Sequence, residues 1–94
     1  MFEFHNIKVA IKEHAMLPIV RIEGETIERS ESTLMFVMID LAEEAEKNGG
    51  KSMDAREEIK GSIKKGTVNI TTQWFFPTMK QREKFLNWAQ KRFS

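Results

Sequence analysis

The residues from Asn48 to Ser52 come closest to a known chemical motif, because they read Asn-Gly-Gly-Lys-Ser and end like a phosphate-binding loop. The full motif needs another glycine five residues before the glycine that precedes the lysine, and a strand that leads into the loop. Ala45 occupies that position, and the residues before the glycines have helical periodicity. We therefore interpret the segment as a glycine stop of one helix followed by the start of another, and not as a nucleotide site.

The two histidines, His5 and His14, are the first candidates for a metal site or for acid–base chemistry. A metal site needs three or four converging ligands, and neither histidine has a second ligand at a helical metal-binding spacing. The chain has no cysteine and no tyrosine, and no serine lies in a nucleophile turn. Its adjacent glutamate pairs project in different directions from a helix and share no substrate. We therefore expect a protein that is not an enzyme and that has no metal and no cofactor; a site assembled from distant carboxylates and a histidine is the alternative.

Charge is the second chemical feature, because acidic and basic residues are sorted along the chain. Residues 1–50 hold five Lys or Arg and ten Asp or Glu, whereas residues 51–94 hold ten and four. A basic half favours a polyanion, so nucleic acid is one partner to consider. The candidates are basic side chains for phosphates and aromatic side chains for stacking on bases: Lys64, Lys65, Lys80, Lys84, Lys91, Arg92, Trp88 and Phe75. The same lysines equally fit the solvated side of an amphipathic helix.

A third group of residues is apolar and falls outside the faces expected to form the core. On a helical projection, Phe36 lies among Thr33, Asp40 and Glu43, away from the apolar stripe of its helix. The candidate protein-contact residues of this kind are Phe36, Ile39, Met35, Leu17 and Ile19. Apolar side chains outside the core indicate a surface that binds another protein or a second copy of the chain. The alternative is a small core that covers this helix on two sides.

The elements that must position these residues begin with two strands. Within residues 2–12, the apolar residues at 7, 9 and 11 alternate with more polar ones, which is typical of a half-buried strand. Near residues 5 and 6 this strand either has a bulge or begins. A second strand is predicted from Leu17 to Glu23, where Gly24 ends it. The two strands predict an antiparallel hairpin.

Two helices are predicted in the middle of the chain. The first begins with a cap at Ser30 or Ser32 and ends at Asn48-Gly49-Gly50, with a broad apolar stripe along one side. Residues 54–65 have a narrower apolar seam, which predicts a shorter helix although Gly61 lies inside it.

The end of the chain predicts a strand followed by a helix. Residues 67–76 alternate along their whole length, which favours a strand. Thr78, with Gln81 three residues later, forms a capping box that predicts the start of the last helix. Arg82 falls within the apolar side of this helix, so we expect a carboxylate to pair with it, and the acidic first helix is the expected source.

Together these elements predict an α+β domain that spans residues 1–94, in the order β-β-α-(α)-β-α. We expect two layers: a three-stranded, mainly antiparallel sheet and two to three helices packed on one of its faces. The chain has neither an apolar run long enough to cross a membrane nor the start of a signal peptide, so we expect a soluble cytoplasmic protein. The functional prediction is a small regulatory protein that acts through protein–protein contacts and self-associates, with nucleic-acid binding through residues 51–94 as the alternative.

Overall fold

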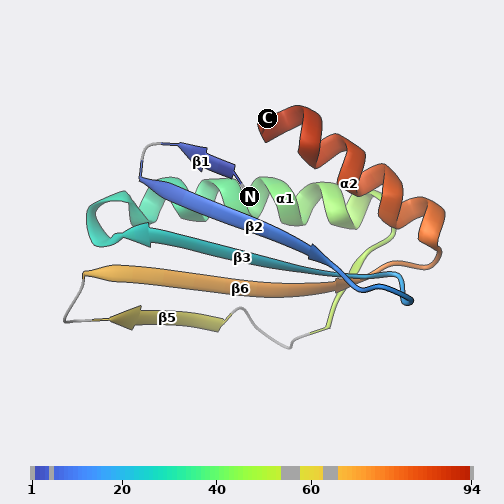
Figure 1. Ribbon diagram of the computed structural model, residues 1–94, viewed down its shortest axis with the longest axis horizontal. Helices are drawn as coiled ribbons and strands as arrows, with labels where there is room; N and C mark the ends of the chain where they lie inside the picture. Colours follow the sequence, from blue (N-terminus) through green and yellow to red (C-terminus); the bar gives the residue numbers. More distant parts are fainter. Residues whose placement is uncertain (1, 5, 54–57, 63–65, 94) are drawn as a thin grey trace.

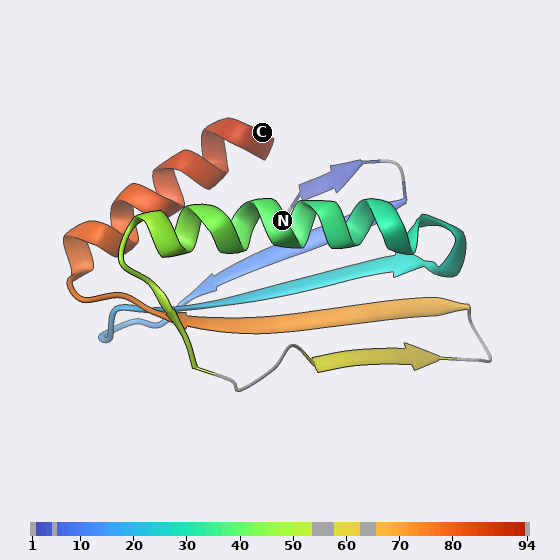
Figure 2. The same cartoon turned by 180° about the vertical axis from the view of Figure 1, so that it is seen from behind.

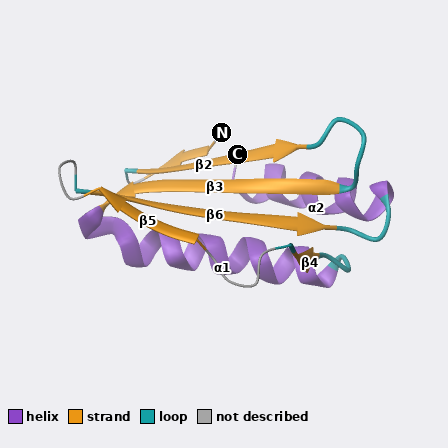
Figure 3. Ribbon diagram, turned by 90° about the horizontal axis from the view of Figure 1, so that it is seen from below, coloured by secondary structure: helices purple, strands orange, loops and turns teal. Residues whose placement is uncertain are grey.

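One antiparallel β-sheet and two helices on one of its faces make up the structure, a computed structural model that describes residues 2–4, 6–53, 58–62 and 66–93 (Figures 1 and 3). This arrangement confirms the predicted α+β class. The elements follow one another as β1 (Phe2–Phe4), β2 (Ile7–Glu13), β3 (Ile19–Ile27), a short 3₁₀ helix (Glu28–Ser30), α1 (Glu31–Lys47), β4 (Lys51–Ser52), β5 (Glu58–Ser62), β6 (Thr67–Phe75) and α2 (Met79–Phe93).

The sheet has the order β1-β2-β3-β6, and both β4 and β5 pair with the outer edge of β6. Its longest ladder joins β3 to β6 over nine paired positions, from Ile19 opposite Phe75 to Ile27 opposite Thr67. Strand β5 pairs with the first half of β6, and β4 pairs with its last two residues. A strand of the basic half of the sequence therefore lies directly beside a strand of the acidic half.

Residues 58–62 form a strand, so the helix predicted over residues 54–65 is wrong in this part. The rest of that range, 54–57 and 63–65, lies outside the described residues. A glycine inside the segment lowers its helix propensity, and an apolar seam this narrow does not distinguish a short helix from a strand. The outer edge of β6 decides the outcome, because its N–H and C=O groups gain partners when β5 pairs with them.

The first predicted strand is two strands, β1 and β2, which pair with each other. The chain reverses between them at a turn that contains Asn6, whose φ of 65° is left-handed. Asparagine tolerates this conformation better than most residues. The hydroxyl of Thr26 donates a hydrogen bond of 3.1 Å to the carbonyl oxygen of Asn6 and ties the turn to β3. A reversal of the chain, and not a bulge or a late strand start, therefore explains why the alternation of apolar residues is interrupted near residue 5.

The core lies between the helix-facing side of the sheet and the inward sides of α1 and α2 (Figures 1 and 2). The prediction that Gly24 ends its strand is wrong, because β3 continues to Ile27. Without a side chain, Gly24 instead lets α1 approach the sheet closely. A Cβ atom there would lie 2.8 Å from Cδ1 of Leu34 and 3.1 Å from Sδ of Met38. Neither α1 nor α2 is long and apolar enough to cross a membrane, within the part of the chain that the structure describes. The core side chains are Ile7, Val9, Val20, Ile22, Leu34, Val37, Met38, Leu41, Ala45, Val68, Ile70, Trp74, Phe76, Phe85 and Ala89.

The end of α1 and the start of α2 follow the sequence signals closely, whereas Ser30 precedes α1 without a capping bond from its side chain. Gly49, with a φ of 80°, donates to the carbonyl of Glu46 at 2.9 Å, and Gly50 donates to the carbonyl of Ala45 at 2.8 Å. These two bonds form a Schellman motif, so the predicted glycine stop is confirmed. Strand β4 follows directly, and the predicted start of the next helix, at residues 54–57, lies outside the described residues. At the other helix, the hydroxyl oxygen of Thr78 accepts the N–H of Gln81 at 3.2 Å, which confirms the predicted cap.

Candidate functional site

The side of α1 that points away from the sheet exposes large apolar side chains. Successive residues turn by about 100° around a helix, which places Phe36 opposite the buried Leu41 and Ala45. Phe36 is 74% exposed, and Ile39, one turn later, is 45% exposed. Exposed acidic residues follow on the next turns. We call Phe36, Ile39, Glu43 and Glu46 the α1 outer surface.

The other predicted protein-contact residues do not join this surface. Met35 is partly buried and packs against the core. Leu17 is half exposed in the turn between β2 and β3, and Ile19 pairs in register with Phe75. Cross-strand partners share one face of a sheet. Ile19 and Phe75 have the parity of the exposed side chains of their strands, so they lie on the face that carries no helix. The predicted contacts therefore divide between two opposite sides of the molecule.

The last helix carries a row of lysines on its solvent side. Lys80, Lys84 and Lys91 are all exposed, on the side of α2 opposite its buried residues Phe85 and Ala89. None of the three forms an ion pair with another described residue, so their ammonium groups face solvent. We call Lys80, Lys84 and Lys91 the lysine row.

The remaining polyanion candidates do not surround the lysine row. Nε of Arg92 forms an ion pair with Oδ2 of Asp40 on α1, at 3.3 Å. The Trp88 ring is partly buried and lies between two phenylalanine rings, with centroid distances of 6.3 and 6.0 Å. Phe75 lies across the sheet on the uncovered face. Lys64 and Lys65 lie outside the described residues. No described aromatic candidate is therefore placed to stack a base beside the row.

The charge sorting of the sequence survives mainly in the helical layer. The chain segment of α1 contains five acidic residues and one lysine, a net charge of −4. The segment of α2 contains five basic residues and one glutamate, a net charge of +4. Within the sheet, by contrast, β6 of the basic half lies directly beside β3 of the acidic half. The outer side of the helical layer therefore presents one acidic and one basic helix side by side.

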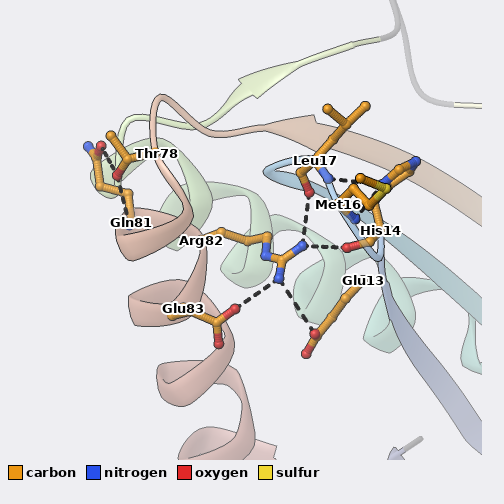
Figure 4. A network of polar contacts seen from close by, with 8 residues as sticks. All are labelled: Glu13, His14, Met16, Leu17, Thr78, Gln81, Arg82 and Glu83. Carbon is orange, nitrogen blue, oxygen red and sulfur yellow. Dashed lines mark hydrogen bonds and ion pairs between the residues drawn. The ribbon is translucent and has the colours of Figure 1, made fainter.

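Arg82 is the polar residue on which the position of α2 depends (Figure 4). Its side chain is only 5% exposed, and its Nη1 donates to the carbonyl oxygens of His14 at 2.7 Å and Leu17 at 2.9 Å. Its Nη2 lies 3.0 Å from a carboxylate oxygen of Glu83 and 3.7 Å from one of Glu13. The expectation that α1 would supply the carboxylate is wrong: one comes from β2 and one from α2 itself.

A histidine side chain also stabilises the segment between β2 and β3 that binds Arg82. Nδ1 of His14 accepts the backbone N–H groups of Met16 and Leu17, both at 3.0 Å. The ring nitrogen therefore stabilises the loop between β2 and β3, while carbonyls of the same loop bind the guanidinium group. This use of His14 is structural and does not require a metal.

The uncovered face of the sheet is polar and has mixed charge. Glu23 accepts from Lys12 at 2.7 Å and from Arg21 at 2.9 Å. The hydrogen bond from Lys12 is the main reason that the pKa of Glu23 is lowered, and burial opposes the shift only partly. A shallow hollow beside this cluster is lined by Lys8, Ala10, Glu23, Gly24, Glu25, Asn69 and Thr71.

The pKa of Glu23 predicts a pH dependence of stability. The pKa of Glu23 is lower in the folded protein than in the unfolded chain. Its ionised carboxylate therefore stabilises the fold at pH values above the usual titration range of a glutamate. This contribution is lost as the pH falls through the lowered pKa. We expect Glu23→Gln to cause a small loss of stability at neutral pH and none in acid, measured by urea denaturation from pH 2 to pH 7. Glu25→Gln, on the same face and without these two ion pairs, is the control. Identical profiles for Glu23→Gln and wild type would contradict the assignment.

No described group of side chains has the arrangement of a catalytic or metal site. No three histidine or acidic side chains converge within the described residues. The hollow beside Gly50 and Lys51 lies at the C-terminal, negative end of α1 and is also lined by Glu46, so it is unsuited to a phosphate.

Comparisons with protein-family models, with curated proteins and with solved structures found no match. A functional assignment therefore depends on the surfaces of this chain.

Proposed function

We propose that the protein acts through protein–protein contact, without catalysis, and that it self-associates through the α1 outer surface. The observation that carries this proposal is the exposure of Phe36. The sheet-facing side of α1 already supplies five buried residues to the core, so the fold does not need an aromatic side chain on the other side. An exposed phenylalanine with an isoleucine one turn later is typical of a contact surface.

The expected gain from covering Phe36 is large enough to support association. A phenylalanine buries about 150–250 Å² in an interface. At about 25 cal/mol per Å², and with most of that area recovered from an exposed state, its burial contributes roughly 2–3 kcal/mol per side chain. Aromatic residues near the centre of an interface are also the usual sites of high binding energy. Glu43 and Glu46 border the apolar pair with charge and restrict the choice of partner.

We expect Phe36→Ala to weaken self-association about 30-fold or more, because it removes the apolar centre of the contact without adding a charge. Sedimentation velocity over a concentration series measures the change, and circular dichroism checks that the variant is folded. Met16→Ala is the matched control: Met16 is also apolar and is 83% exposed, but it lies in the turn between β2 and β3.

A strict monomer at the highest attainable concentration would overturn self-association. If Met16→Ala dissociated the protein and Phe36→Ala did not, the contact would lie at the turn between β2 and β3, and the assignment to α1 would be wrong.

Nucleic-acid binding is the second candidate function, and the lysine row supports it. Three exposed lysines along one side of α2 match a surface that contacts phosphates without reading sequence. The acidic α1 beside the row acts against a polyanion. The same lysines are therefore better explained by a partner that also satisfies α1.

A further inference from the structure

We propose that the partner on the α1 outer surface is the helical layer of a second copy, arranged so that α1 of each protomer faces the lysine row of the other. This inference rests on the proposed function, because it assumes that the α1 outer surface is a contact. It adds the identity of the partner and the surface with which α1 pairs.

Charge complementarity within one face is the main argument. Glu43 and Glu46 are exposed on α1, and Lys80 and Lys84 are exposed on α2. Residues three and four apart lie about 5–6 Å from each other on a helix, so the two pairs have matching spacing. Both helices cover the same face of the sheet, and their solvent sides face outward together (Figures 1 and 2). The molecule therefore carries an acidic strip and a basic strip on one accessible face.

Two-fold symmetry turns this pattern into two identical contacts. A two-fold axis that lies in the plane of the interface, along the helices and midway between them, places α1 of each protomer over α2 of its partner. Such an interface is closed and gives a dimer, not a filament. With 17 and 15 residues, the helices are about 26 Å and 23 Å long, so each can cover most of the other. In this arrangement Phe36 lies against the stems of the partner's lysines, which are apolar.

Other classes of partner match the charge of only one of the two strips. A nucleic acid or an anionic lipid surface attracts the lysine row but is repelled by the glutamates of α1. A basic peptide attracts α1 but is repelled by the lysine row. A partner that satisfies both must present an acidic strip beside a basic one at the same separation, and the helical layer of this chain has that pattern itself.

The size of the face predicts a weak dimer. Two helices of about 25 Å by 10 Å give a footprint of roughly 500 Å² per protomer. This is less than the roughly 800 Å² per partner of a standard stable interface, so the dimer should be reversible at micromolar concentration. Its ion pairs are exposed at the rim, so its dissociation constant should rise with salt.

Charge reversal on one helix at a time tests the pairing. We expect E43K/E46K and K80E/K84E each to remain monomeric, because like charges then face each other in both contacts. An equimolar mixture of the two variants should associate again, since each acidic helix then meets a basic one. The quadruple variant E43K/E46K/K80E/K84E should also dimerise, because its two helices have exchanged charges. Sedimentation velocity measures all four samples, with at least a tenfold difference in dissociation constant expected between the single-helix variants and the mixture. Circular dichroism establishes that each variant is folded.

Three results would overturn the inference. If wild type dimerises and Phe36→Ala weakens the dimer, but the mixture does not associate, α1 contacts another surface and the proposed function stands alone. If wild type is monomeric at every concentration, the inference and the proposed self-association both fail. If wild type remains monomeric but binds an oligonucleotide at low salt, and K80E/K84E removes that binding, the lysine row serves nucleic acid instead.

Discussion

Replacing Arg82 by methionine is expected to lower the free energy of unfolding by about 2–3 kcal/mol, because two backbone carbonyls lose a charged donor. Methionine keeps much of the apolar stem of arginine, so the packing of α2 changes little and the loss reports on the polar contacts. The carbonyl oxygen of His14 then loses its donor, whereas that of Leu17 keeps only the N–H of Ile19, at 2.7 Å. Urea denaturation followed by tryptophan fluorescence measures the change.

Two further variants separate the parts of this effect. Arg82→Lys keeps the charge but replaces a planar fork by a single ammonium group, so we expect a loss of about 1–2 kcal/mol. Lys84→Met, on the solvent side of the same helix, should stay within about 0.5 kcal/mol of wild type. Equal stability of the Arg82→Met variant and wild type would show that water replaces the guanidinium group at this turn without cost.

Local signals of the sequence predicted much of the fold. Alternation identified β6 and the regular part of β2, and glycines and a threonine identified the end of α1 and the start of α2. These signals work because caps and strand alternation depend on neighbours in the sequence. Residues 58–62 show the limit of local signals. Their conformation depends on the edge of β6, a partner that the local pattern does not contain.

The candidate site was predicted less completely. Helical geometry alone placed Phe36 outside the core and the lysines on one side of α2, and the structure bears out both placements. It did not show that Ile19 and Phe75 lie on the opposite face of the sheet from α1. That separation depends on the register between β3 and β6, which joins residues 40 to 56 positions apart in sequence. The partners of Arg82 were missed for the same reason, because the turn that binds it lies 65 to 68 positions away.

The glutamates of the α1 outer surface were not predicted as contacts, although the signal was present. Glu43 was already placed beside Phe36 by helical geometry, but an acidic residue on a solvent side is common and carries little information alone. Its significance comes from the second helix, which places the lysine row on the same face of the molecule. Charge on one helix is ordinary, whereas opposite charge on two neighbouring helices restricts the partner.

Gly50→Ala is expected to cost about 3 kcal/mol, because the new methyl group has no space at the end of α1. A Cβ atom at Gly50 would lie 2.7 Å from the backbone oxygen of Ala45 and 3.0 Å from Cε1 of Phe76. The Ala45 oxygen cannot retreat without breaking its 2.8 Å hydrogen bond from Gly50, which closes the helix. Phe76 is fully buried and cannot retreat either. Thermal or urea denaturation measures the loss.

Gly49→Ala provides the comparison that separates steric overlap from backbone strain. Gly49 has a φ of 80°, so an alanine there costs about 1–2 kcal/mol through its left-handed conformation. Its closest new contacts are side-chain atoms, Nε2 of Gln81 at 2.9 Å and Cγ of Pro77 at 3.0 Å, and the glutamine amide can move away. We therefore expect Gly50→Ala to be the more damaging change although only Gly49 has a left-handed backbone. The reverse order would mean that strain, and not contact with Ala45, makes glycine necessary where α1 ends and β4 begins.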